Sequence, residues 1–185
     1  MQISFVDLKR QNKIHLRTYQ DVITNCIVEA EFIDGKAVND FEKKFAAYCN
    51  KLDCITVISG TDALFLTLLA YEIGPGDEVI TTPNSYFSTA MVIEHTGAKV
   101  VFADIDPNTY TINPAEVEKK ISSRTRALIP IHLFGQPANM DPLITLAKKN
   151  SIFIIEDCCQ AHGAKYKDKT VPYTETGAFS FYPGK

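Results

Sequence analysis

Residues 152–155 are apolar at every position, and two acids, Glu156 and Asp157, follow them directly. A short run that is apolar throughout predicts a strand buried on both faces of a sheet, as in parallel α/β folds. The carboxylate of Asp157 then stands at the carboxyl end of this strand, where open α/β sheets bind their ligands. This run therefore favours an α/β fold with a candidate site at the strand end.

The remaining sequence alternates strand and helix patterns joined by short turns. Strands are predicted at residues 54–58, 78–82, 99–103 and 126–131, and helices at residues 14–30, 38–49 and 141–149, after Gly60, through Met91 to His95 and from Asn113. Such alternation predicts a mostly parallel sheet with helices on both faces. Asn39 or Asp40 is expected to cap the second helix, and Asn113 to cap the helix that has Pro114 in its first position. Residues 3–8 are expected to form a short apolar entry segment.

Charge and composition argue against several classes of partner. The net charge is −3 and no run of lysine or arginine occurs, which disfavours nucleic acid or an anionic membrane as the main partner. No apolar stretch reaches the length of a membrane span, and the N-terminus lacks a signal-peptide pattern, so a cytoplasmic protein is expected. The hydrophobic content of 45% is sufficient for a globular core.

The cysteines are odd in number and scattered, and we expect buried thiols in a reducing compartment. They are Cys26, Cys49, Cys54, Cys158 and Cys159. Cys158 and Cys159 lie close in sequence to His162, but adjacent cysteines match no common zinc spacing, so no metal site is predicted.

A candidate anion site lies at residues 59–62, Ser-Gly-Thr-Asp, between the predicted strand 54–58 and the next helix. Backbone N–H groups at such a turn, together with the helix dipole, favour a phosphate. An ordinary strand-to-helix turn with Asp62 in its first helical turn fits these residues equally well. The segment is not a Walker loop, because the Gly-Lys-Ser/Thr ending is missing.

Residues 179–185 place a hydroxyl, Ser180, and an amine, Lys185, on one short segment. An acid at a strand end and a lysine nearby are what pyridoxal phosphate chemistry requires. The lysine holds the aldehyde as a Schiff base, and the acid keeps the pyridine nitrogen protonated. Singly, an acid such as Asp157 is more often a helix cap and a terminal lysine is usually just solvated, but the two together in this order favour a cofactor site.

Two segments carry a specific resemblance, residues 156–164 (Glu-Asp-Cys-Cys-Gln-Ala-His-Gly-Ala) and residues 179–185 (Phe-Ser-Phe-Tyr-Pro-Gly-Lys). They are similar to the two signature segments of the DegT/DnrJ/EryC1/StrS family of pyridoxal-phosphate-dependent sugar aminotransferases. The resemblance implies the aspartate-aminotransferase-like fold of the type I enzymes. Family members continue well beyond the lysine, so residues 1–185 are expected to be the N-terminal part of the cofactor-binding large domain, without the small C-terminal domain. Such a fragment is not expected to be a competent aminotransferase alone.

The resemblance also implies the catalytic residues. Lys185 corresponds to the Schiff-base lysine, which also moves the proton during transamination. Asp157 corresponds to the acid that pairs with the pyridinium nitrogen. Gln160, three residues further on, corresponds to the amide on the phenolic side of the ring.

The same resemblance assigns the residues that hold the cofactor. Gly60, Thr61 and Asp62 match the turn that receives the phosphate, and Ser180 is expected to bind the same group. Tyr86 matches an aromatic residue that covers one face of the ring, a type of stacking worth about 0.5–1.5 kcal/mol.

By resemblance, the reaction moves an amino group, usually from glutamate, to a keto group of a nucleotide-linked sugar in amino-sugar and polysaccharide biosynthesis, in a homodimer. Gln160 and Lys185 speak against the dehydratase branch, which has histidine in place of the lysine. Two alternatives remain open, namely a truncated, inactive remnant and a nucleotide-binding module that uses Asp157 for a ribose. The absence of a Gly-x-Gly-x-x-Gly turn counts against the second.

Three further expectations concern neighbouring residues. His132 follows a predicted strand and is either an acid–base group or, as we favour, structural. Phe87, next to Tyr86, is expected in the core. Residues 171–176 depart from the family pattern, which usually has glycines and a Gly-Asp pair there.

Overall fold

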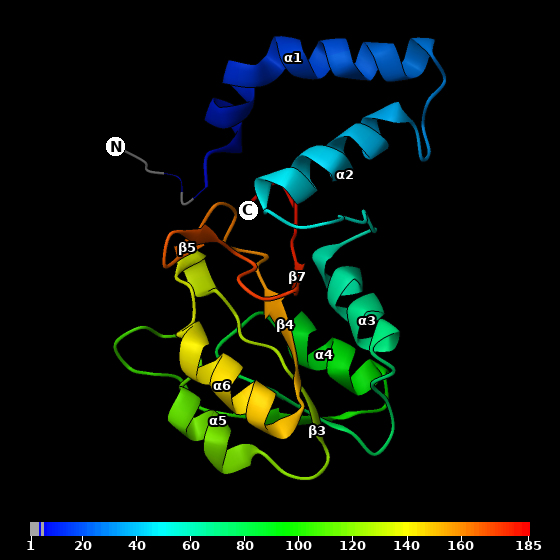
Figure 1. Cartoon of the computed structure of the whole chain (residues 1–185). Coiled ribbons are helices and arrows are strands. Elements are labelled where there is room, and N and C mark those ends of the chain that lie inside the picture. Colours follow the sequence, from blue (N-terminus) through cyan, green and yellow to red (C-terminus); the bar gives the residue numbers. More distant parts are fainter. Residues whose placement is uncertain (1–3, 5) are drawn as a thin grey trace.

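A parallel five-stranded sheet forms the centre of the computed structural model, which describes residue 4 and residues 6–185 (Figure 1). Its strands are β1 (Glu78–Thr81), β2 (Lys99–Phe102), β3 (Thr125–Leu128), β4 (Phe153–Asp157) and β7 (Thr176–Ala178). They lie in the order β2-β1-β3-β4-β7, and each neighbouring pair is parallel. A separate antiparallel pair joins β5 (Lys165–Tyr166) to β6 (Lys169–Thr170). The expected parallel α/β sheet is confirmed.

Helices cover both faces of this sheet. One face packs against α3 (Gly60–Ala70) and α4 (Ser88–His95), and the other against α5 (Pro114–Lys120) and α6 (Met140–Asn150). Alternate residues of a strand point to opposite faces, so Val79 of β1 packs with α3 and α4 while Ile80 packs with α5 and α6. The expected cap of α5 is confirmed, because the Asn113 side chain accepts a hydrogen bond from the N–H of Ala115.

Strand β4 ends at Asp157, as the apolar run 152–155 predicts. Its last three residues are buried, whereas Phe153 at its beginning is 38% exposed. The backbone of Asp157 also bridges to Ile131, beyond the end of β3. The strand end that carries the acid therefore lies inside the sheet, between β3 and β7.

The first two helices begin earlier than their periodicity predicts. Helix α1 (Leu8–Val28) is capped by the Asp7 side chain, and α2 (Lys36–Tyr48) begins after Gly35. The prediction that Asn39 or Asp40 caps α2 is therefore wrong, because both residues lie inside the helix. Helix α1 lies apart from the sheet, with no buried residue (Figure 1). Two apolar members of the expected entry segment, residues 3 and 5, lie outside the described residues.

The predicted strand at residues 54–58 is absent from the structure. These residues form no ladder with any described strand, and Ile55 and Ile58 are exposed. A groove of about 750 Å³ is lined by this segment, α2, α3 and the segment that contains β7. The β-branched composition indicated a strand, but a strand forms only when a neighbour accepts and donates its backbone hydrogen bonds.

Two composition-based expectations have mixed outcomes. All five cysteines are free, but only Cys49 and Cys158 are buried, so the expectation of uniformly buried thiols is wrong. Within the described residues, none of the helices combines the length and apolar character needed to cross a membrane.

Candidate active site

Asp157 presents a nearly buried carboxylate, 6% exposed, at the carboxyl end of β4. One carboxylate oxygen, Oδ1, accepts a hydrogen bond from the N–H of Cys159 at 3.1 Å. The other, Oδ2, accepts one from the Thr89 hydroxyl at 2.9 Å. A carboxylate has about four acceptor positions, so each oxygen keeps capacity for a further donor.

The N-terminus of α3 lies beside the chain segment that follows β7. A Cβ atom on Gly60 would lie 2.7 Å from Cys159 Sγ and 2.9 Å from Ser180 Cβ, so only glycine fits this approach. Cys159 in turn donates its N–H to Asp157. The predicted phosphate turn, Ser180 and Asp157 are thus brought together around Cys159.

The backbone N–H groups at this helix start differ in availability. The N–H of Asp62 donates to Ser59 Oγ, and the Ser59 hydroxyl donates to Asp62 Oδ2 at 2.7 Å. The Ser59 hydroxyl is therefore the N-cap of α3, and the Asp62 carboxylate accepts its proton and orients it. Among the described residues, the N–H groups of Gly60 and Thr61 have no hydrogen-bond acceptor. They are the two donors left for an anion at the positive end of the helix dipole.

Lys185 is exposed on the short segment after Ser180, and its backbone N–H donates to the carbonyl of Tyr182. The positive charge of its side chain affects the pKa of two other groups. Burial lowers the pKa of His162, the Ser180 backbone opposes this through a hydrogen bond, and the positive charge of Lys185 adds to the lowering. Burial and the Asp157 charge raise the pKa of the Cys159 thiol, and the Lys185 charge opposes that rise.

Tyr86 and Phe87 lie in the connection between β1 and α4. Both rings are exposed, Tyr86 by 71% and Phe87 by 72%. The expectation that Phe87 lies in the core is therefore wrong. The carbonyl of Tyr86 accepts a hydrogen bond from the N–H of Thr89, which ties this exposed loop to the helix start.

Gln160 is half-buried and directly follows Cys159 in the sequence. Its side-chain oxygen accepts a hydrogen bond from the N–H of Phe134 at 3.1 Å. In the described part of the chain its amide nitrogen has no partner, so the side chain is oriented and still has donors to offer.

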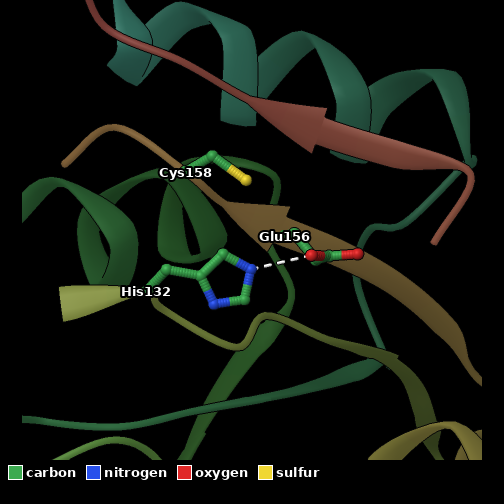
Figure 2. Close-up of side chains that lie close together, drawn as sticks. All are labelled: His132, Glu156 and Cys158. Carbon is green, nitrogen blue, oxygen red and sulfur yellow. Dashed lines mark hydrogen bonds and ion pairs between the residues drawn. The ribbon is translucent and has the colours of Figure 1, made fainter. Parts of the chain in front are cut away.

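His132 and Glu156 form a fully buried pair (Figure 2). Because strand side chains alternate, Glu156 points to the opposite side of β4 from Asp157. His132 Nδ1 accepts the N–H of Ala138, so its proton is on Nε2, which donates to Glu156 at 2.7 Å. Both ring nitrogens are thereby engaged within the protein. This arrangement supports the structural interpretation of His132.

Glu156 is held by donors from two separate segments. Besides His132, it accepts hydrogen bonds from the N–H groups of Tyr173 and Thr174 and from the Thr174 hydroxyl. Burial alone would raise the pKa of Glu156, but the hydrogen bonds from His132 and Thr174 hold it below its ordinary value. The segment 171–176, which departs from the family pattern, is therefore anchored to β4 by this carboxylate.

Cys158 lies close to the same pair, and potential ligand atoms of the three residues are within 4.8 Å of one another (Figure 2). Burial and the Glu156 charge raise the pKa of the Cys158 thiol well above its ordinary range. A thiol that stays protonated is a poor metal ligand, and the carboxylate and imidazole are already hydrogen-bonded. His132 and Glu156 are accounted for as members of a hydrogen-bonded network, and Cys158 packs beside them.

Sequence reasoning missed the residues that contact the acids from other elements. Thr89 carries no predicted role, and Glu156 appears only as a neighbour of Asp157. An alternating strand pattern places Glu156 and Asp157 on opposite sides, which indicates that each needs its own donors. No local signal identifies which residues supply them.

A parallel α/β fold with an acid at the end of an inner strand, a helix N-terminus and a lysine-bearing segment defines a class of protein. It is the fold of type I pyridoxal-phosphate-dependent transferases, to which the structural neighbours belong. Residues 15–185 match the model of the DegT/DnrJ/EryC1/StrS aminotransferase family. The chain belongs to this family.

Relatives and solved structures agree with this assignment. The chain is 44% identical over 97% of its length to a dTDP-3-amino-3,6-dideoxy-alpha-D-galactopyranose transaminase of Aneurinibacillus thermoaerophilus, covering 50% of that protein. DesV of Streptomyces venezuelae, solved with a ketimine intermediate, superposes with a TM-score of 0.96 at 40% identity, over 99% of this chain and 50% of DesV. A putative sugar aminotransferase of Streptococcus pneumoniae in its PLP form gives 0.81 at 28% identity, over 88% and 46% of the two chains. The chain spans about half the length of these proteins.

Proposed function

We propose that this chain supplies the pyridoxal phosphate site of an aminotransferase that acts on a nucleotide-linked keto-sugar. In this proposal residues 1–185 form the N-terminal part of the cofactor-binding large domain. The relatives' activity on dTDP-linked sugars and the PLP form of a neighbour support it. The donor is proposed to be glutamate, which the family resemblance implies.

The observation that carries the proposal is the convergence of unlike elements on Cys159. Its N–H donates a hydrogen bond to the strand-end acid Asp157, and its thiol lies beside the point where Gly60 and Ser180 come close together. Ring-nitrogen and phosphate ligands of one small cofactor would have to lie on adjoining elements in this way. A Cβ on Gly60 would fill the space, so glycine keeps the helix start close to Ser180.

The donor chemistry of these residues fits a phosphorylated pyridine. The free N–H groups of Gly60 and Thr61, with the Ser180 hydroxyl, would bind the phosphate. The Asp62 carboxylate would act indirectly, since it caps α3 through Ser59. Tyr86 would cover one face of the ring.

The remaining residues would act on the ring and its substituents. When bound, pyridoxal phosphate supplies an aldehyde that condenses with amines and a ring that withdraws electrons. Asp157 would hold the proton on the ring nitrogen through a charge-assisted hydrogen bond. The amide of Gln160 would donate to the phenolic oxygen, and the Lys185 amine would hold the cofactor covalently and move a proton.

We further propose that the protein works as a homodimer. Helix α1 exposes the apolar side chains of Tyr19, Ile23 and Ile27, which recur every four residues on one stripe. A stripe of this kind is normally covered, and a second subunit would cover it.

Covalent labelling of Lys185 tests the proposal. The 185-residue protein is incubated with pyridoxal phosphate, reduced with borohydride and digested, and the modified peptide is identified by mass spectrometry. We expect the label on Lys185, and its loss in Lys185→Arg, with circular dichroism confirming that both proteins are folded. A folded protein labelled at other lysines, or unlabelled, would contradict the assignment.

A further inference from the structure

Thr89 contributes the one side-chain hydroxyl that contacts Asp157 among the described residues. It is the second residue of α4, is 1% exposed, and donates to Asp157 Oδ2 at 2.9 Å. The opposite oxygen is held by the N–H of Cys159. Both carboxylate oxygens therefore accept a hydrogen bond, one from the loop that follows β4 and one from α4.

The direction of this hydroxyl is unlike that of Thr67 in α3 and Thr145 in α6. Thr67 in α3 and Thr145 in α6 each donate to the backbone carbonyl four residues earlier, at 2.7 and 2.9 Å. That is the ordinary bond of a helical threonine. Thr89 lies in the first turn of α4, and its hydroxyl instead donates to Asp157 at the carboxyl end of β4.

Thr89 also connects the acid to the Tyr86 loop. Its backbone N–H donates to the Tyr86 carbonyl at 3.3 Å, while its side chain donates to Asp157. One buried residue therefore joins the ring-covering aromatic and the ring-nitrogen acid of the proposed site. Because threonine is β-branched, its χ1 angle is restricted, and the hydroxyl has little freedom to turn away.

We propose that Thr89 is a positioning residue that fixes the Asp157 carboxylate for the pyridinium N–H of the cofactor. The inference rests on the proposed function, because it gives Asp157 that partner. Without the hydroxyl, Oδ2 keeps its charge but loses its only described side-chain donor, and the carboxylate can rotate about its χ2 angle. The cofactor would then meet an acid that is present but poorly oriented.

Binding of pyridoxamine phosphate, which needs no covalent bond to lysine, tests the proposal on the 185-residue protein. Equilibrium dialysis gives the Kd for the wild type, Thr89→Val, Thr89→Ser and Asp157→Asn. Valine keeps the shape and removes the hydroxyl, and serine keeps the hydroxyl. We expect Thr89→Val to weaken binding about tenfold, the usual weight of a hydrogen bond to a charged group, and Thr89→Ser to stay within about twofold of wild type.

The double variant Thr89→Val/Asp157→Asn separates positioning from general packing. If Thr89 acts through Asp157, the loss on adding Thr89→Val should shrink in the Asp157→Asn background. Thr81→Val is the matched control, since Thr81 is equally buried and its hydroxyl donates to the Ile129 carbonyl at 2.9 Å, away from Asp157. It should lower the thermal midpoint without changing the Kd. If Thr89→Val does not fold, Thr89→Ala takes its place.

The outcomes distinguish the proposed cofactor site from the proposed role of Thr89. Absence of binding by folded wild type would overturn the proposed function and the Thr89 role with it. Binding that Asp157→Asn weakens but folded Thr89→Val leaves unchanged would overturn the Thr89 role alone. Equal losses for Thr89→Val in both backgrounds would also overturn it, because the residue would then act independently of Asp157.

Discussion

A Cβ atom on Gly60 would lie 2.9 Å from the Cβ of Ser180, although the two residues are far apart in the sequence. Gly60 begins α3, and Ser180 follows β7. The contact brings the two free N–H groups of a helix start and a hydroxyl to the same place. The glycine is needed here for close approach, since Cys159 and the carbonyl of Phe179 surround the same position.

Replacing Gly60 by alanine should therefore destabilise the protein and disturb the proposed phosphate site. The added methyl group would require Cys159 or Ser180 to move, a type of overpacking that costs about 1–3 kcal/mol. Urea unfolding followed by circular dichroism measures the loss. Gly74→Ala is the control, because its nearest neighbour, the Thr96 carbonyl, would lie at 3.5 Å, an ordinary contact. Equal stabilities of the two variants would contradict the steric argument.

Replacing Glu156 by glutamine should destabilise the fold. The carboxylate accepts bonds from His132, Tyr173 and Thr174, and an amide nitrogen cannot accept those directed at it. Donors left unpaired in the interior cost about 1–3 kcal/mol each. Chemical denaturation at pH 7 measures this loss, and Glu116→Gln, at an exposed pair on α5, serves as the control. A Glu156→Gln variant as stable as the control would contradict the network.

The same carboxylate predicts a pH dependence. Its pKa in the folded protein is lowered from 4.5, chiefly because the His132 and Thr174 bonds outweigh the effect of burial. A lowered pKa means that the unfolded chain binds the proton more readily. Its contribution is therefore complete above pH 4.5 and is lost as the pH falls toward the folded-state value. Thermal midpoints recorded from pH 6 to about 3 should fall less steeply in Glu156→Gln than in wild type. Parallel curves would refute this assignment.

The charge of Lys185 should be visible in the titration of His162. Packing of the imidazole near Phe179 and Phe181, at ring distances of 5.3 and 5.0 Å, accompanies the burial that lowers the His162 pKa. The Lys185 ammonium lowers it further. Lys185→Met should thus raise the His162 pKa in a proton NMR titration. Lys148→Met, at an exposed site of α6, should leave it unchanged. An unshifted His162 in Lys185→Met would place the amine away from the site.

Charge on the α1 stripe should weaken self-association. Ile23 and Ile27 are both exposed and lie one turn apart on this helix. Changing both to lysine would place two charges in the proposed subunit interface, where uncompensated charge is disfavoured. Sedimentation velocity should show a shift from dimer to monomer. Replacing the exposed, polar Gln20 and Thr24 by lysine is the control, and monomeric wild type would overturn the dimer proposal.

Local patterns were sufficient for most of the sheet and its covering helices. The apolar run at 152–155 and the Asn113 cap of α5 both form in the structure as the local pattern predicts. The segment 54–58 shows where this fails, because its residues are β-branched but lack a paired neighbour. The prediction that Phe87 is buried is wrong for a related reason. Hydrophobicity alone does not determine which side chain of a loop packs against the core.

The sequence by itself determined that an acid would end a buried parallel strand and that a capped helix and a lysine-bearing segment would accompany it. These are properties of hydrophobic periodicity and of short turns, which act over a few residues. Only the tertiary structure decided which distant residues contact each other. Thr89 donates a hydrogen bond to Asp157, and Glu156 accepts hydrogen bonds from both His132 and Tyr173. Gly60 lies against Ser180. Those partners are set by how crossovers place helices and loops along the sheet edge, and a hydrogen bond between distant residues leaves no periodic trace in the chain.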